Sequence, residues 1–207
     1  MAKIRLTKGE LKKQRDALRR YERYLPTLQL KKQQLQMEIL HQLAVLGQKR
    51  DIEEAKAREI DIWAGLLSDP KAMDLSPSIR PKDVKTGTRN IAGVDIPVFD
   101  HAEFETIEYD LFITPPWVDA AIDDLRAIVA IIEERRVIEK GIEILRHELR
   151  ITTQRVNLFE KVKIPEAEEA IRRIKIYIGD QMTNGVGRSK MAKRKIGEVE
   201  FSEVSAW

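Results

Sequence analysis

The chain lacks several features on which common functions depend. Its 207 residues include no cysteine, which excludes disulfide bonds and cysteine-ligated metal sites and fits a reducing compartment. No stretch approaches the roughly 20 apolar residues of a membrane-spanning helix, and the N-terminus leads into a polar helix rather than an apolar signal core. The formal net charge is only +3, so the chain as a whole does not have the balance of a strongly basic nucleic-acid binder.

Residue patterns that support catalysis are also missing. The segment Lys85–Thr88 lacks the glycine-rich spacing before its lysine that would hold phosphates. The three histidines, His41, His101 and His147, are far apart in the sequence, and two of them fall on flanking positions of expected helices. Adjacent carboxylates diverge around a helix and indicate solvated faces; these pairs are Glu53–Glu54, Asp123–Asp124 and Glu133–Glu134. We therefore predict no catalytic residue, no cofactor and no metal site, and a chain that is not itself an enzyme.

The chain does contain two long segments with a seven-residue apolar repeat. They run from about Leu6 to Leu67 and from about Val118 to Met182, in a sequence with 34% charged and 6% aromatic residues. This composition and periodicity predict a coiled coil. Each helix would span about 90 Å, which predicts a rod. The repeat includes Leu11, Leu18, Leu25, Ile39, Leu46 and Ile60 in the first segment, and Ile138, Leu145, Thr152 and Phe159 in the second.

The economical arrangement of two helices of similar length is an antiparallel hairpin within one chain. If the helices join near Leu67 and Val118, Leu25 should lie near Phe159 and Ile39 near Leu145. Thr7 is the predicted N-cap of the first helix, with Glu10 completing a capping box. The apolar repeat weakens between Lys49 and Arg58, which predicts loose packing or another partner there.

Proline and glycine positions predict irregularities in both helices. Pro26 should kink the first helix near Tyr24, because it removes a hydrogen bond and clashes with the preceding turn. Pro165 coincides with a shift in the apolar register, so we expect the second helix to bend or unwind there. We expect Gly185 and Gly187 to end that helix.

The middle of the chain differs in kind from the helical segments. We expect loop from Pro70 to Lys85, one or two edge strands from Ile91 to Phe99, and a further strand from Phe104 to Ile113. Trp63 and Trp117 flank this lobe and are predicted to staple the base of the hairpin, with contact to a partner as the alternative. The predicted domains are residues 1–67, 68–117, 118–183 and a basic, frayed tail at 184–207. The lobe residues that we single out are Ile91, Gly93, Val94 and Pro97.

Two basic clusters are candidates for partner contact. One lies on the face of the first helix that is opposite the apolar repeat, and the other in the C-terminal tail; their members are Lys12, Arg15, Arg19, Arg188, Lys190, Lys193, Arg194 and Lys195. A charged helix face is usually only solvated, and the tail has the alternative interpretation of a solvating terminus. Nucleic acid is disfavoured because no aromatic platform accompanies the charges.

The stretch from Arg155 to Pro165 resembles the signature of the D subunit of V-type and archaeal-type rotary ATPases. Leu6–Leu11 resembles the opening helix of that family, and Asn90–Pro97 resembles its central hairpin. The resemblance extends in order and spacing from Leu6 to about Ile178. Its most specific residues are Arg155, Val156, Asn157, Ile164 and Pro165.

The resemblance implies a central rotor shaft that couples ATP hydrolysis or synthesis to ion translocation. The terminal end of the hairpin would enter the ring of catalytic A and B subunits. The small F subunit of the rotor would bind along the shaft, and a membrane-side connector subunit (C/d) would receive the lobe end. The chain would then be cytoplasmic and peripheral to the membrane, without spanning it. The alternative is a free-standing coiled-coil scaffold or tethering protein, which composition and periodicity alone do not distinguish from a shaft.

Overall fold

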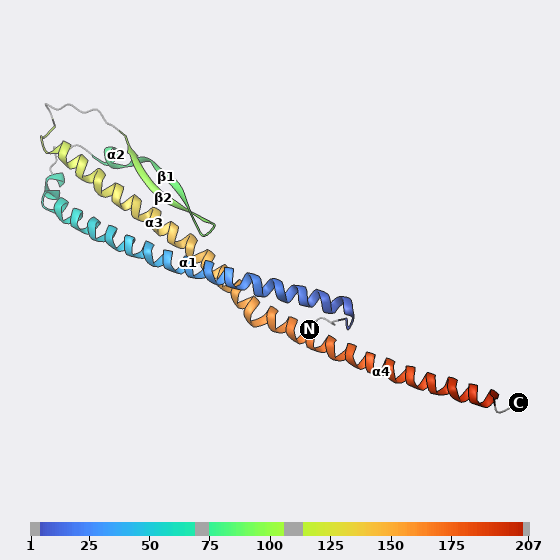
Figure 1. Cartoon of the computed structure of the whole chain (residues 1–207). Helices are drawn as coiled ribbons and strands as arrows, with labels where there is room; N and C mark the ends of the chain where they lie inside the picture. Colours follow the sequence, from blue (N-terminus) through green and yellow to red (C-terminus); the bar gives the residue numbers. More distant parts are fainter. Residues whose placement is uncertain (1–4, 69–74, 106–113, 205–207) are drawn as a thin grey trace. The chain divides into compact units, whose positions relative to one another are not determined.

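The computed structural model describes residues 5–68, 75–105 and 114–204 (Figure 1). It is mainly helical, and a two-stranded antiparallel sheet lies between the long helices in the sequence, as predicted. The elements are α1 (Lys8–Asp61), η1 (Ala64–Ser68), α2 (Ser76–Ile79), β1 (Pro81–Ile91), β2 (Val94–Phe104), α3 (Val118–Leu158), the π-helical turn η2 (Phe159–Lys163) and α4 (Ile164–Val204).

The start of α1 is capped as predicted, although only by half of a capping box. The Glu10 backbone N–H donates a hydrogen bond to Thr7 Oγ1 at 3.3 Å, which satisfies one of the free N–H groups of the first turn. The Glu10 carboxylate does not reach back to Thr7; instead it accepts a hydrogen bond from Gln14 Nε2 at 2.8 Å. From this cap α1 runs to Asp61 and continues through Pro26 without interruption.

The chain forms two compact units, and each unit contains part of both helical segments. Unit 1 consists of residues 1–29 and 154–207, and unit 2 of residues 30–153. Antiparallel pairing thus brings residues from the two ends of the chain into the same unit.

Unit 2 has a core of three layers. Leu35 and Ile39 from α1, Val94 and Ile96 from β2, and Leu145 from α3 form one buried cluster, in which Leu35 and Leu145 are completely inaccessible. The predicted proximity of Ile39 and Leu145 is therefore confirmed. A second cluster lies at the base of the hairpin, where partly buried Trp63 and Trp117 pack as predicted; its buried members are Leu75, Val118, Ala121 and Ile122.

Ion pairs between α1 and α3 occupy the stretch in which the apolar repeat weakens. Lys49 Nζ lies 2.7 Å from a Glu134 carboxylate oxygen, and Arg135 Nε lies 2.9 Å from Glu53. Their side chains are only a quarter to a third exposed. Further pairs between the two helices are Lys31–Glu148, Arg50–Glu139 and Lys56–Asp124. This stretch is thus paired by charge, and its one large apolar residue, Ile52, is 48% exposed.

The β-hairpin turns at Ala92 and Gly93, both of which have positive φ (51° and 76°). This geometry suits the right-handed twist of a two-residue hairpin. The Asn90 side chain closes the turn, since its Oδ1 accepts from the Gly93 N–H at 3.1 Å and its Nδ2 donates to Asp95 at 2.7 Å. In Figure 1 the hairpin runs along α3, and a Cβ at buried Gly141 would lie 3.9 Å from the Pro97 carbonyl oxygen.

The predicted strand boundaries were wrong in two places. β1 begins at Pro81, inside the segment expected to be loop, and the expected strand at Ile91–Phe99 contains the turn itself. Of the further strand predicted at Phe104–Ile113, Phe104 ends β2, and residues 106–113 lie outside the described residues. The position of the turn was missed because Ala92–Gly93 is not one of the usual turn dipeptides, which have asparagine or aspartate first.

In unit 1, α1 and α4 lie side by side in both figures. A series of buried residues along α4 forms the packed face: Ala167, Ala170, Ile171 and Ile174, the last completely inaccessible. The Tyr21 and Phe159 rings are in contact, with centroids 5.2 Å apart. Phe159 was predicted to lie near Leu25, and Tyr21 is one helical turn from Leu25, so the antiparallel register holds to within a turn.

The predicted unwinding before Pro165 is confirmed and takes the form of a π-helical turn. Residues Phe159–Lys163 adopt i→i+5 hydrogen bonding, and the Ile164 N–H donates to the Phe159 carbonyl. Proline lacks an N–H and its ring clashes with the preceding turn of a regular α-helix. A π turn inserts one extra residue, which accounts for the register shift seen in the sequence.

The predicted end of the second helix was wrong. α4 continues through Gly185 and Gly187 to Val204, and neither glycine has the positive φ of a helix-terminating residue. Glycine inside a helix is tolerated at about 1 kcal/mol relative to alanine, so two glycines weaken a helix without stopping it.

Candidate functional site

The N-terminal part of α1 carries a continuous basic face. It consists of Lys8, Lys12, Arg15, Arg19 and Arg23, all of which are exposed. Their spacing of three or four residues places them on one side of the helix. The partly buried residues Leu11, Leu18 and Leu25 lie along one edge of this side. The predicted candidates Lys12, Arg15 and Arg19 therefore form one surface, which we call the basic face.

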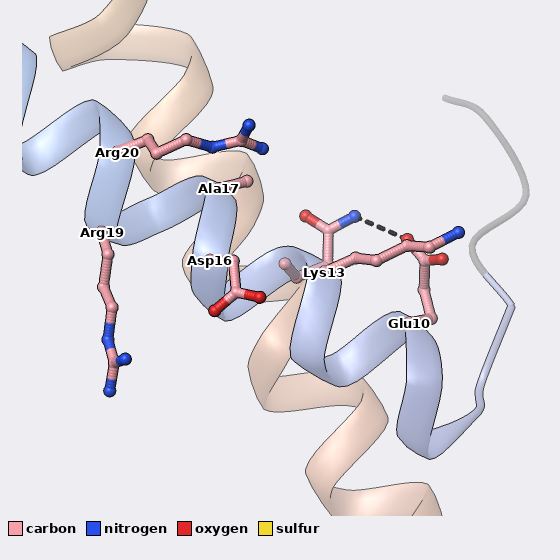
Figure 2. Close-up of a pocket in the computed structure, with 7 residues that line it drawn as sticks. Glu10, Lys13, Asp16, Ala17, Arg19 and Arg20 are labelled. Atoms are coloured by element: carbon pink, nitrogen blue, oxygen red, sulfur yellow. Dashed lines mark hydrogen bonds between the residues drawn. The ribbon is translucent and has the colours of Figure 1, made fainter.

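Further cations extend this charge around the helix. Figure 2 shows Arg19 and Arg20 leaving α1 on different sides. Lys13, Arg19 and Arg20 line an open pocket together with Glu10 and Asp16. The Glu10 carboxylate in this pocket is held by Gln14 (Figure 2). The pocket is a hollow on a charged helix surface, and its mixed lysine, arginine and carboxylate lining suits a protein surface rather than a small ligand.

The basic residues of the tail lie on α4 rather than in a frayed end. Arg188, Lys190, Lys193, Arg194 and Lys195 are all exposed. At 100° per residue they point to several sides of the helix, so the compact run in the sequence becomes a charged collar in space. Arg188 Nε also donates to the Asn184 carbonyl at 3.4 Å. A collar of this kind suits a partner that surrounds the helix.

The two units differ strongly in charge. Unit 1 contains 20 lysines and arginines against 11 aspartates and glutamates, a net charge of +9. Unit 2 contains 17 against 23, a net charge of −6. The small charge of the whole chain therefore conceals two surfaces of opposite sign. A net charge of one sign steers partners of the other sign, so unit 1 suits an acidic partner.

One carboxylate of unit 1 is strongly perturbed. Hydrogen bonds from Arg172 and then from Arg173 hold the pKa of Glu169 down, at about 2. Both partners are on the same helix, three and four residues away. The perturbation therefore reflects local helix stabilisation rather than acid–base chemistry.

The residues of the sequence signature lie on either side of the π turn. Val156 is buried, whereas Arg155 and Asn157 are exposed in the turn of α3 just before it. Ile164 and Pro165 follow directly after it, partly buried and exposed respectively. The signature thus encodes the irregular turn and leaves two polar side chains on the surface.

The lobe residues support the packing and the turn of the β-hairpin. Val94 is in the core of unit 2, partly buried Ile91 packs on that core, and Gly93 makes the turn.

Sequence reasoning missed two exposed apolar surfaces of unit 2. On α1, Met37 and Leu40 are 72% and 67% exposed, and Met37 borders an open pocket beside the hairpin turn. At the end of α1, Ile62 is 86% exposed, and Leu66 and Leu67 in η1 are about half as exposed as that. Leu67 falls on the seven-residue repeat counted from Leu11, yet it is exposed. Single exposed apolar residues are common, but grouped ones mark interaction sites.

The three histidines lie on different elements of the described structure. His41, His101 and His147 are all exposed and lie on α1, β2 and α3 respectively. Within residues 5–68, 75–105 and 114–204, no group of three or more histidine or carboxylate side chains is placed to hold a metal ion. In the same ranges no helix is both long and apolar enough to cross a bilayer.

Fold and surfaces together define a class of protein: one with antiparallel pairs of long helices, a β-hairpin, opposite net charges on its two units and exposed apolar patches. The profile of the ATP synthase D subunit family matches residues 10–194. The chain is 47% identical to the V-type ATP synthase D subunit of Borreliella burgdorferi, over 95% of this chain and 96% of that protein. It is 35% identical to the V-type ATP synthase D subunit of Chlamydia caviae, over 94% of each chain. The chain belongs to the ATP synthase D subunit family.

Proposed function

We propose that this chain is the central stalk, or rotor, component of a V-type rotary ATPase. It couples ATP hydrolysis or synthesis in the catalytic head to ion translocation across the membrane, and it does so without catalytic residues or a cofactor of its own. The observation that carries this proposal is the match to the D subunit family over residues 10–194, which includes both helical segments, the hairpin and the π turn. The chain is then peripheral to the membrane, on its cytoplasmic side.

Unit 1 is the part that enters the ring of catalytic A and B subunits. Its net charge of +9, the basic face on α1 and the charged collar on α4 support this assignment. An acidic inner wall of the ring would attract such a surface, and the attraction would weaken with ionic strength because exposed charges are screened.

Unit 2 provides surfaces for the other two partners. The exposed Met37 and Leu40 suit the small F subunit, which would bind along the helix pair. The exposed Ile62, Leu66 and Leu67 suit the membrane-side connector subunit, which would cover the end at which the two helices are joined. Both assignments rest on grouped apolar exposure, which marks interaction sites in soluble proteins.

Native mass spectrometry of the full chain mixed with the A and B subunits tests the proposal. We expect one copy of the chain on each catalytic ring. Reversing the basic face in the triple variant K12E/R15E/R19E should weaken ring binding, and raising the salt concentration should weaken binding of the wild type. The matched control K140E/R146E/R150E reverses three exposed cations on α3 of unit 2 and should leave ring binding unchanged.

The alternative function, a free-standing scaffold, gives the opposite result in the same experiment. A scaffold would dimerise through its own seam and would ignore the ring. A chain that forms homodimers and fails to bind the A and B subunits would refute the rotor assignment. Equal weakening by the two triple variants would refute the assignment of ring contact to unit 1.

A further inference from the structure

The packed face of α4 continues beyond the helix that covers it. Its buried residues Ala167, Ile171 and Ile174 are spaced by three or four positions. The same spacing continues through Ile178, Met182, Gly185, Ser189, Ala192 and Ile196. We call these last six residues the uncovered seam. They occupy the side of α4 that packs in unit 1, because steps of three and four residues keep one face of a helix.

Within the described residues this seam is largely uncovered from Met182 onward, whereas Ile178 is partly buried. α1 begins at Lys8, and Figure 1 shows α4 continuing well past that point. Met182 is 63% exposed and Ile196 is 60% exposed, although Ile174 on the same face is completely inaccessible. Met182, Gly185 and Ser189 also line one groove with the neighbouring Val186, Lys190 and Lys193.

The uncovered part of α4 is also intrinsically weak as a helix. Thr183, Asn184, Gly185, Val186 and Gly187 are five consecutive poor helix formers. A helix without tertiary packing is marginal in water even when its residues favour helix, because most helical stability in proteins comes from burying an apolar face. This stretch therefore has neither the local propensity nor the packing that the preceding turns of α4 have.

We propose that α4 from Ile178 to Ile196 becomes a stable helix only when a partner covers the uncovered seam. The partner is an apolar wall edged with carboxylates, because the seam is largely apolar and cations of the charged collar flank it: Arg188 on one side, and Lys190 and Lys193 on the other. This inference rests on the proposed function, in which the wall belongs to the catalytic ring. The continuity of the seam with the α1–α4 packing indicates that the wall takes over from α1 as the covering surface. Insertion and helix formation are then one coupled event.

Hydrogen exchange of backbone amides, measured by mass spectrometry on the full chain, tests the coupling directly. In the free chain, peptides covering residues 178–196 should exchange quickly, while peptides covering 166–177 stay protected. In the chain bound to the A and B ring, both regions should be protected. Equal protection of both regions in the free chain would overturn the coupling.

Glycine variants give a second, independent test. Gly187 lies off the seam, and a Cβ there meets nothing within 4 Å. Gly187→Ala should slow exchange in the free chain and strengthen ring binding by up to about fivefold, since alanine favours helix over glycine by about 1 kcal/mol. Gly47→Ala is the matched control, because Gly47 is equally open but lies in the paired region of α1; it should leave ring binding unchanged. Unchanged ring binding by Gly187→Ala, with helicity raised, would overturn the proposal.

The outcomes separate this inference from the proposed function. A chain that joins the ring but leaves residues 178–196 unprotected refutes the inference and leaves the rotor assignment intact. A chain that does not bind the ring refutes the rotor assignment, and protection of 178–196 through formation of a homodimer would assign the seam to a second copy instead. The free-chain measurement needs no partner, so it tests the weak helix in every case.

Discussion

The two units share one architecture, an antiparallel pair of helices, but stabilise it differently. In unit 2 a β-hairpin covers the helix pair, so that Leu145 lies among residues from three elements. Charges in unit 2 also join one helix to the other, as in Lys49–Glu134 and Glu53–Arg135. In unit 1 the packing face is one layer between two helices, and the ion pairs described, such as Glu169–Arg172, lie within one helical stretch.

This difference shows how one chain can combine a self-contained part with a part that is completed by partners. Unit 2 satisfies much of its charge internally and presents separate apolar patches. Unit 1 keeps most of its excess positive charge on the surface and leaves the end of its seam uncovered. We expect this contrast to be energetic as well as geometric.

The largest effect is expected in the three-layer core. Leu145→Asp would bury an unpaired carboxylate at a position with no solvent access, and should destabilise the chain by about 3 kcal/mol or more. Chemical denaturation followed by circular dichroism measures the loss. The adjacent Ile144→Asp is the control, because Ile144 is 40% exposed and its variant should be close to wild type. Similar losses for both variants would mean that the helix face has been assigned wrongly.

A smaller loss is expected in the two-helix seam of unit 1. Ile174 is as inaccessible as Leu145, but it lies between two helices with no third layer. Ile174→Ala should cost about 2 kcal/mol, the low end of the range for such truncations, because two helices can close a cavity more easily than a three-layer core. Leu145→Ala is the comparison and should cost more. If Ile174→Ala proved the more costly variant, the two units would not differ in packing as described.

The helix pairing, the irregular turn before Pro165 and the basic face could all be predicted from the sequence. Apolar periodicity is a direct consequence of helix geometry, so Ile39 and Leu145 were correctly paired by number alone. The proline rule likewise located the irregularity before Pro165. The basic face was visible as a series of cations outside the positions of the apolar repeat, and these cations are exposed in the structure.

The remaining features depend on tertiary contacts that local patterns do not report. The position of the hairpin turn depends on Ala92 adopting a positive φ, which its side chain disfavours and which packing of Ile91 and Val94 on the helices enforces. The ion pairs between α1 and α3 could be predicted only by knowing which residues of the two helices face each other. The continuation of α4 past Gly185 contradicts a local stop signal, and the opposite charges of the units became visible only when both ends of the chain were assigned to one unit.

A third prediction concerns the hairpin, the element that unit 1 lacks. Gly93 has a φ of +76°, so Gly93→Ala should destabilise unit 2 by about 1 to 2 kcal/mol through backbone strain. The space around Gly93 is open, so steric contact adds nothing. Gly87→Ala in β1 is the control, since Gly87 is equally open without positive φ. A loss for Gly87→Ala that matched that of Gly93→Ala would show that strand packing, rather than turn conformation, sets the cost. Thermal denaturation of both variants measures the difference.

The smallest effect is expected from the charge network within α4. Arg172 and Arg173 lower the pKa of Glu169 to about 2, from 4.5 in an unstructured chain. Because the folded pKa is the lower one, the ionised carboxylate contributes stability above about pH 4.5, and this contribution is lost as the pH falls toward 2. Glu169→Gln should therefore lower Tm slightly at pH 6, and its difference from wild type should shrink as the pH approaches 2. Glu168→Gln removes a neighbouring exposed carboxylate and should show no such convergence. A difference for Glu169→Gln that is constant from pH 6 to pH 2 would contradict the ionic origin of this stabilisation, and with it the view that the ion pairs described in unit 1 act within a helix rather than between helices.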